Sequence, residues 1–138
     1  MAAKRRDVRE SAFIISFEAL FRDDTVDELF ESASEIDNII LNDEVKKVVE
    51  GIIGKKDELD GYISKYSNKR ALSRIPKINL AILRLAVYEA LYDDKVPVNV
   101  AISEAVALAE KYSYDQDIAF INGVLGSFSK EIGGKENG

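Results

Sequence analysis

The sequence predicts an all-α fold in which a single compact domain contains six or seven helices. Nearly every segment repeats its apolar residues at the three-to-four-residue spacing of a helix, and no segment alternates convincingly as a strand does. The 138 residues are 46% hydrophobic and 32% charged, with eight glycines and two prolines. This composition is typical of globular proteins, and the length suffices for one domain with a buried core.

The first two helices are predicted from an apolar stripe and a capping motif. The stripe indicates a helix from about Arg5 to Phe21. Its members are Val8, Ala12, Ile15 and Ala19. Thr25 and Glu28 have the spacing of a capping box, in which each side chain bonds the backbone N–H of the other residue. A second helix should therefore begin after Thr25.

A third helix is predicted to begin at Asn42 or Asp43, because both side chains can cap a helix. Its apolar pattern continues to Tyr66. Gly51 and Gly54 lie in its middle, and each glycine weakens a helix by about 1 kcal/mol relative to alanine. The sequence therefore permits a kink in this helix.

The most apolar helix is expected after the short piece RALSRI. Pro76, which suits the first turn of a helix, opens the segment PKINLAILRLAVYEALY. This segment is apolar almost all the way round, so we expect it at the centre of the domain. Glu89 falls on its Ile78, Ile82 and Leu85 stripe, so its carboxylate should be buried with a partner. Arg84 is predicted to be a structural cation by the same reasoning.

Two further helices complete the predicted fold. They cover about Val98–Tyr112 and Asp115–Ile132, after a turn at residues 93–97. The domain is expected to comprise residues 1–132, and residues 133–138 are expected to form a frayed tail.

The composition excludes several classes of function. The chain has no cysteine and no histidine, which removes disulfides, thiolate metal sites, Cys nucleophiles and the commonest general base. No Gly-rich phosphate loop is present. We therefore expect no enzyme activity, no metal and no cofactor. No apolar run is long enough to span a membrane, and no signal-peptide pattern follows the basic start. These features fit a cytoplasmic protein.

Charge is segregated along the chain although the net charge is −6. Residues 1–10 contain four cations and two acids, and residues 65–84 contain six cations and no acid. Residues 18–60 contain five cations and fourteen acids. An acidic protein can still present a positive face if the fold gathers the basic blocks.

Three stretches resemble the NusB family of bacterial transcription antitermination factors. They are RRDVRESAFIISF, AILRLAVYEAL and VPVNVAISEAVALAEKYSYDQDIAFINGVL, which occur in the family's order and span nearly the whole chain. The resemblance implies two small helical bundles packed together. It also implies binding of single-stranded boxA RNA with the ribosomal protein NusE, in a complex on RNA polymerase that favours readthrough of ribosomal RNA operons.

The resemblance and the charge pattern together predict the RNA-binding residues. They are Lys4, Arg5, Arg6, Arg9, Arg70, Arg74, Gln116 and Phe120. Guanidinium groups offer forked donors to phosphate and flat faces to unstacked bases. The alternatives are a solvated helix start for the first four cations, a solubilising edge for the later cations, and a core position for Phe120.

The same resemblance places partner contacts at Phe17 and Asn79, with a core position as the alternative for Phe17. The lack of acids in residues 65–84 adds Lys77 as a partner contact. Phe17 stands where the family usually has Tyr, Ile14 where it favours Gln, and Asp117 where it usually has Ser. These departures weaken polar contacts or add a charge that repels phosphate. We expect Asn122 to make a buried hydrogen bond and Gly123 to allow a close helix–helix approach.

Three alternative interpretations remain open. The chain can be a protein-interaction module that has lost RNA binding, or an RNA-binding accessory domain of an RNA methyltransferase. It can also be a homodimer that hides its basic face. The sequence does not decide between monomer and homodimer.

Overall fold

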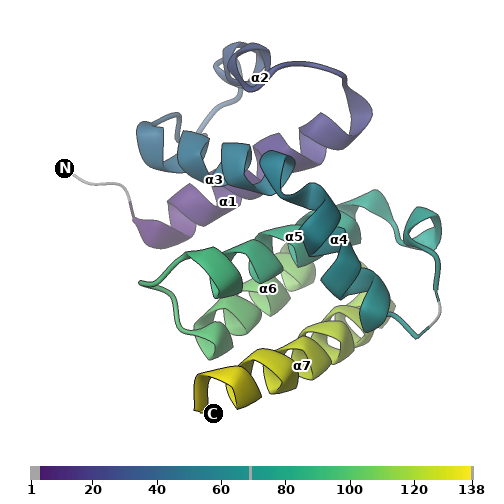
Figure 1. Ribbon diagram of the computed structural model, residues 1–138. Coiled ribbons are helices and arrows are strands. Elements are labelled where there is room, and N and C mark those ends of the chain that lie inside the picture. Colours follow the sequence, from purple (N-terminus) through teal and green to yellow (C-terminus); the bar gives the residue numbers. More distant parts are fainter. Residues whose placement is uncertain (1–3, 69, 138) are drawn as a thin grey trace. The chain divides into compact units, whose positions relative to one another are not determined.

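The computed structural model describes the backbone of residues 4–68 and 70–137, and side chains as far as residue 133. Over these residues the fold is all-helical, which confirms the predicted fold class (Figure 1). The helices are α1 (Arg5–Glu18), α2 (Val26–Ala33), α3 (Asp43–Gly54), α4 (Lys56–Lys65), α5 (Lys77–Tyr92), α6 (Val98–Tyr112) and α7 (Asp115–Asn137). Two short 3-10 turns, η1 (Ala19–Phe21) and η2 (Leu72–Arg74), follow α1 and precede α5.

The chain divides into two compact units, Met1–Lys55 and Lys56–Gly138. The boundary coincides with the break between α3 and α4. At Lys55 the backbone leaves helical geometry, with φ −113° and ψ 15°. The kink that Gly51 and Gly54 permit is therefore a full interruption of the predicted third helix.

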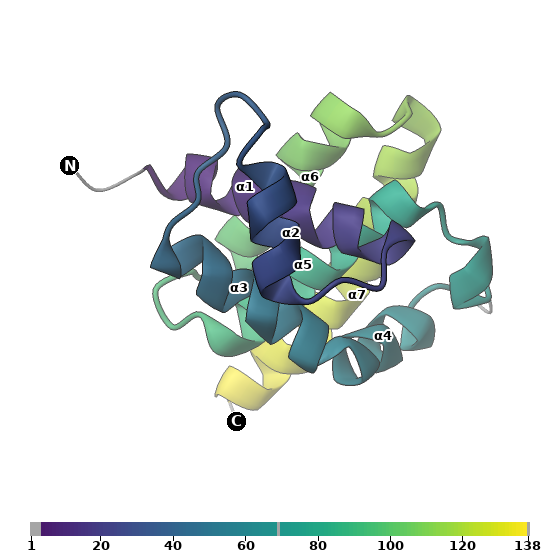
Figure 2. The ribbon, with the colours of Figure 1, turned by 90° about the horizontal axis from the view of Figure 1, so that it is seen from above.

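The first unit is built from α1, α2 and α3. In Figure 2, α2 crosses over α1, and contacts join α1 to both of the other helices. The buried core consists of Val8, Ala12, Ile15, Leu29, Ala33, Val45 and Val49. Three of these residues, Val8, Ala12 and Ile15, lie on the stripe that predicted the first helix.

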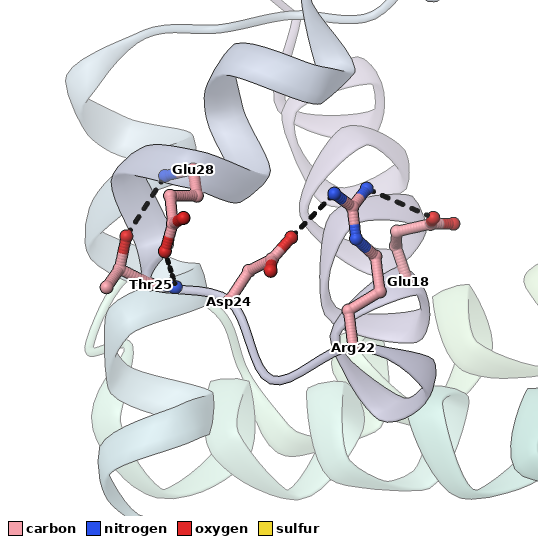
Figure 3. Close-up of polar contacts among 5 residues, drawn as sticks. All are labelled: Glu18, Arg22, Asp24, Thr25 and Glu28. Carbon is pink, nitrogen blue, oxygen red and sulfur yellow. Dashed lines mark hydrogen bonds and ion pairs between the residues drawn. The ribbon is translucent and has the colours of Figure 1, made fainter.

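Side chains cap the starts of α2 and α3 as the sequence predicts. The backbone N–H of Glu28 donates to Thr25 Oγ1 at 3.1 Å, and the backbone N–H of Thr25 donates to Glu28 Oε1 at 2.9 Å (Figure 3). The hydrogen bond from Thr25 lowers the pKa of the Glu28 carboxyl. Asn42 Oδ1 accepts the backbone N–H of Val45 at 2.8 Å. These bonds satisfy donors that a helix start leaves unpaired.

The second unit is organised around α5. From Asn79 to Glu89, every residue of α5 except Arg84 is buried. This confirms the predicted central helix, and it confirms that Glu89 is buried, with 5% of its surface exposed. Helices α4, α6 and α7 all contact α5.

The helix α4 is joined to its neighbours by polar and aromatic contacts. Arg84 donates two hydrogen bonds of 2.7 Å to Asp60, which confirms its predicted structural role. Tyr92 donates a hydrogen bond to Glu58. The rings of Tyr62 and Phe128 meet edge-to-face at 5.3 Å, which joins α4 to α7.

Two expectations for α7 are wrong. Asn122 is exposed, and Gly123 has open space where a side chain would lie. The reason is the phase of the helix, whose buried stripe consists of Ile121, Val124, Leu125, Phe128 and Ile132. This stripe turns the Asn-Gly pair toward solvent.

The last helix extends past its predicted end at Ile132 to Asn137. Gly138 lies outside the described residues, and fraying of residues 133–138 stays a prediction. Among the described helices, none has the length and apolar character that crossing a membrane requires.

Arg84→Met should destabilise the protein more than a surface charge change does, because the Asp60 carboxylate would lose its partner while only 17% exposed. The expected loss lies between about 1 kcal/mol for an exposed pair and about 3 kcal/mol for a buried one. Urea unfolding measures it. Arg84→Met combined with Asp60→Leu should recover part of the loss, and a double variant less stable than Arg84→Met would contradict this interpretation.

The hydrogen bond to Glu58 raises the pKa of Tyr92 to about 12, because it stabilises the protonated phenol. The stabilisation is therefore fully present below the unfolded pKa of about 10 and is lost as the pH rises through the folded pKa. Glu58→Gln should move the titration of Tyr92 back toward its ordinary range, as followed by NMR of its ring. Glu44→Gln, at an exposed position on α3, should leave it unchanged.

Candidate nucleic-acid interface

The basic start of the chain presents three of its four cations to solvent. Lys4, Arg5 and Arg6 are exposed, and the Lys4 carbonyl accepts the Val8 N–H at 3.0 Å. Arg9 is only 6% exposed. It lies on a helical face with Phe13 and Ser16, which are also buried. The RNA contact of Arg9 stays a prediction, and Arg9 is far less accessible than its three neighbouring cations.

The second unit brings together two predicted RNA-binding residues that lie fifty positions apart. The Arg70 guanidinium carbon sits 4.3 Å from the centre of the Phe120 ring, which is cation–π geometry. Gln116 is exposed one turn before Phe120 on α7, so both side chains share a face of the helix. We call Arg70, Gln116 and Phe120 the stacking surface.

A hydrogen-bonded turn holds the backbone of Arg70. The buried Ser67 hydroxyl lies 3.1 Å from the Ser64 carbonyl and 3.2 Å from the Arg70 carbonyl, and it can donate to either. The Arg70 N–H donates to the Ser67 carbonyl at 3.0 Å. Asn68 takes the left-handed conformation, with φ 51°, which asparagine tolerates better than most residues. The sequence signal for this turn is the Ser-Asn pair after α4.

Arg74 and Lys77, in the second basic block (residues 65–84), are exposed. Arg74 ends η2 and Lys77 begins α5, and both side chains are open to solvent. Lys69 lies outside the described residues. The two basic blocks belong to different compact units.

The predicted partner residue Asn79 lies in the core of the second unit. It is completely buried, and its Oδ1 accepts a 2.7 Å hydrogen bond from the Ser113 hydroxyl. Because α5 is buried nearly all round, even a polar residue such as Asn79 lies in the core. Asn79 therefore fixes the turn between α6 and α7 and has no surface to offer a partner.

This turn carries an aromatic residue that the sequence reasoning missed. Tyr114 is 78% exposed, and its carbonyl accepts the Asp117 N–H at 2.9 Å at the start of α7. The sequence signal for Tyr114 is its place in the polar stretch SYDQD, where it belongs to no apolar stripe. Asp115 and Asp117 favour the helix start electrostatically, but they add negative charge beside Gln116.

Phe17 lies between the core and solvent in the first unit. Its ring stacks on buried Phe13 at 6.2 Å and meets Phe21 edge-to-face at 5.1 Å. Phe21 is 58% exposed. The pair therefore offers a partly exposed aromatic edge at the end of α1, and Phe21 is an addition to the residues selected from sequence.

The described residues suit recognition of a charged, aromatic ligand. Cations and rings supply ionic contacts and stacking. Over the part of the chain that the structure describes, no three acidic side chains gather in a way that could hold a metal ion.

Phe120→Leu should release the Arg70 side chain with little loss of stability, because an exposed cation–π contact contributes about 0.5–1 kcal/mol. In the wild type, the ring current of Phe120 should shift the NMR signals of the Arg70 side-chain protons. These signals should move toward free-arginine values in the variant. Phe30→Leu, in the other unit, is the matched control. Unchanged Arg70 signals in Phe120→Leu would contradict the contact.

Comparisons with known proteins agree with this architecture. The NusB family model matches residues 6–130. The transcription antitermination protein NusB of Acetivibrio thermocellus is 41% identical over 91% of this chain and 88% of that protein. A solved structure of NusB from T. maritima superposes with a TM-score of 0.82 at 29% identity, covering 95% of this chain and 94% of that one.

A second solved structure contains the antitermination factors NusB and NusE in complex with dsRNA. It matches with a TM-score of 0.80 at 27% identity, over 92% of this chain and 96% of that one. Together with the family match, which spans most of the sequence, these similarities show that the chain belongs to the NusB family.

Proposed function

We propose that this protein is a transcription antitermination factor that binds single-stranded boxA RNA together with NusE. In this role it promotes readthrough of ribosomal RNA operons by RNA polymerase. Family membership supports the proposal, as does a relative whose structure contains NusE and dsRNA. The observation that carries it is the stack of Arg70 on Phe120, with Gln116 one turn away.

The stacking surface offers contacts for both the face and the edge of an unpaired base. A half-exposed ring and a guanidinium plane both accept a base face, and Gln116 can donate to or accept from a base edge. The exposed cations Arg5, Arg6 and Arg74 provide phosphate contacts. The proposed role involves no bond making or breaking, so it needs neither a cofactor nor a metal, and it places the protein in the cytoplasm.

We further propose that Phe17 and Lys77 contribute to partner binding. Phe17 offers an aromatic edge beside exposed Phe21, and Lys77 offers an exposed cation. An interface needs apolar anchors within a polar rim, and these residues supply one of each.

Fluorescence anisotropy with labelled boxA RNA tests the proposal. Scrambled RNA and a duplex of the same sequence serve as comparison ligands, each with and without NusE. Single-stranded boxA RNA should bind most tightly, and NusE should tighten it. Arg5→Ala with Arg6→Ala should reduce the slope of log affinity against log salt by about 1.4, because each phosphate contact contributes about 0.7.

The matched control is Lys47→Ala, an exposed cation on α3 within the acidic block, which should leave the slope unchanged. Equal affinity for boxA and scrambled RNA in the presence of NusE would overturn the proposal. That result would favour a protein-interaction module, in keeping with the burial of Arg9 and the carboxylates beside Gln116.

A further inference from the structure

We propose that a groove between α1 and α2 binds a cationic, leucine-rich helical segment of another protein. The groove lies within the first compact unit and has a volume of about 570 Å³. Its floor is apolar and buried, formed by Ile15, Leu29 and Ala33. The groove shares no residue with the proposed RNA-binding set.

Apolar side chains on the groove walls remain accessible. Ile14 is half-buried, and Ile36 in the loop after α2 is 45% exposed. Water at such apolar walls is released when an apolar partner covers them, which favours binding. A surface between two helices suits a helix that inserts side chains spaced one turn apart.

The acidic side chains at the rim of the groove favour a positively charged partner. Glu18, Glu31 and Glu35 line the groove and are exposed. The one cation of the lining, Arg22, is already engaged by two acids: it lies 2.6 Å from Asp24 and 3.6 Å from Glu18 (Figure 3).

The helix α2, Val26–Ala33, contains no cation and three acids, one of which is the rim residue Glu31. Nucleic acid is therefore repelled from the groove, whereas lysine or arginine flanking an apolar stripe finds complementary charge.

The test is an NMR titration of the full chain with three synthetic peptides. The first carries leucines at one-turn helical spacing and lysines at its other positions. The second replaces the lysines with glutamates, and the third replaces the leucines with serines. Only the first should bind saturably, and it should shift the amide signals of Ile14, Ser32 and Ile36. Equal binding of the third peptide would reduce the effect to charge attraction and overturn the proposal.

Two variants locate the binding site. Ser32→Trp should fill the groove and weaken binding of the first peptide about tenfold or more, a change of about 1.4 kcal/mol. Ser103→Trp, at an exposed position on α6, is the matched control and should bind as the wild type does. If Ser32→Trp unfolds the unit, Glu31→Lys with Glu35→Lys should weaken the same peptide through exposed positions alone. Wild-type affinity in the folded groove variants would overturn the proposal.

Two further measurements distinguish peptide binding in the groove from self-association of this protein and from RNA binding. Concentration-dependent shifts at Ile14 and Ile36 without peptide would indicate a second copy in the groove and would overturn it. Affinity of Ser32→Trp for boxA RNA should equal that of the wild type. The groove and the proposed RNA function can therefore fail independently.

Discussion

The burial of α5 is the constraint on which the second unit depends. A sixteen-residue helix that is apolar nearly all round is stable in water only if other elements cover it. Helices α4, α6 and α7 provide that cover. The ion pair between Arg84 and Asp60 then fixes α4 against α5, and the ring contact between Tyr62 and Phe128 fixes α4 against α7.

The stacking surface follows from this arrangement. Because α4 is held against α7, the chain that leaves α4 passes the start of α7. The turn at Ser67 then places Arg70 against the Phe120 ring. On the other side, the hydrogen bond from Ser113 to buried Asn79 fixes the turn from which Tyr114 and α7 begin. The stacking surface is therefore held by contacts that also stabilise the core. Because its side chains are already ordered, binding a ligand would cost little further conformational entropy.

Much of this fold could be predicted from the sequence because its signals are local. The capping box at Thr25, the cap at Asn42 and the continuous apolar pattern of α5 each depend on neighbouring residues. The burial of Arg9 and Asn79 and the exposure of Asn122, which the sequence did not predict, have a different cause. The width of the buried stripe on a helix, and hence which residues lie just outside it, depends on helices that are distant in sequence. Arg9 and Asn79 are buried because their helices bury broad arcs, whereas Asn122 sits just outside the arc of α7. The pairing of Arg70 with Phe120 is likewise a tertiary result, since nothing local links those positions.

A double-mutant cycle on boxA RNA binding tests most directly whether Arg70 and Phe120 act as one surface. Affinity in the presence of NusE would be measured for the wild type, Arg70→Ala, Phe120→Ala and the double variant. If the two side chains bind a base together, the double variant should lose less affinity than the sum of the two single losses, with a coupling of about 0.5–1 kcal/mol. Losses that simply add, or single variants that bind as the wild type does, would contradict a joint stacking surface.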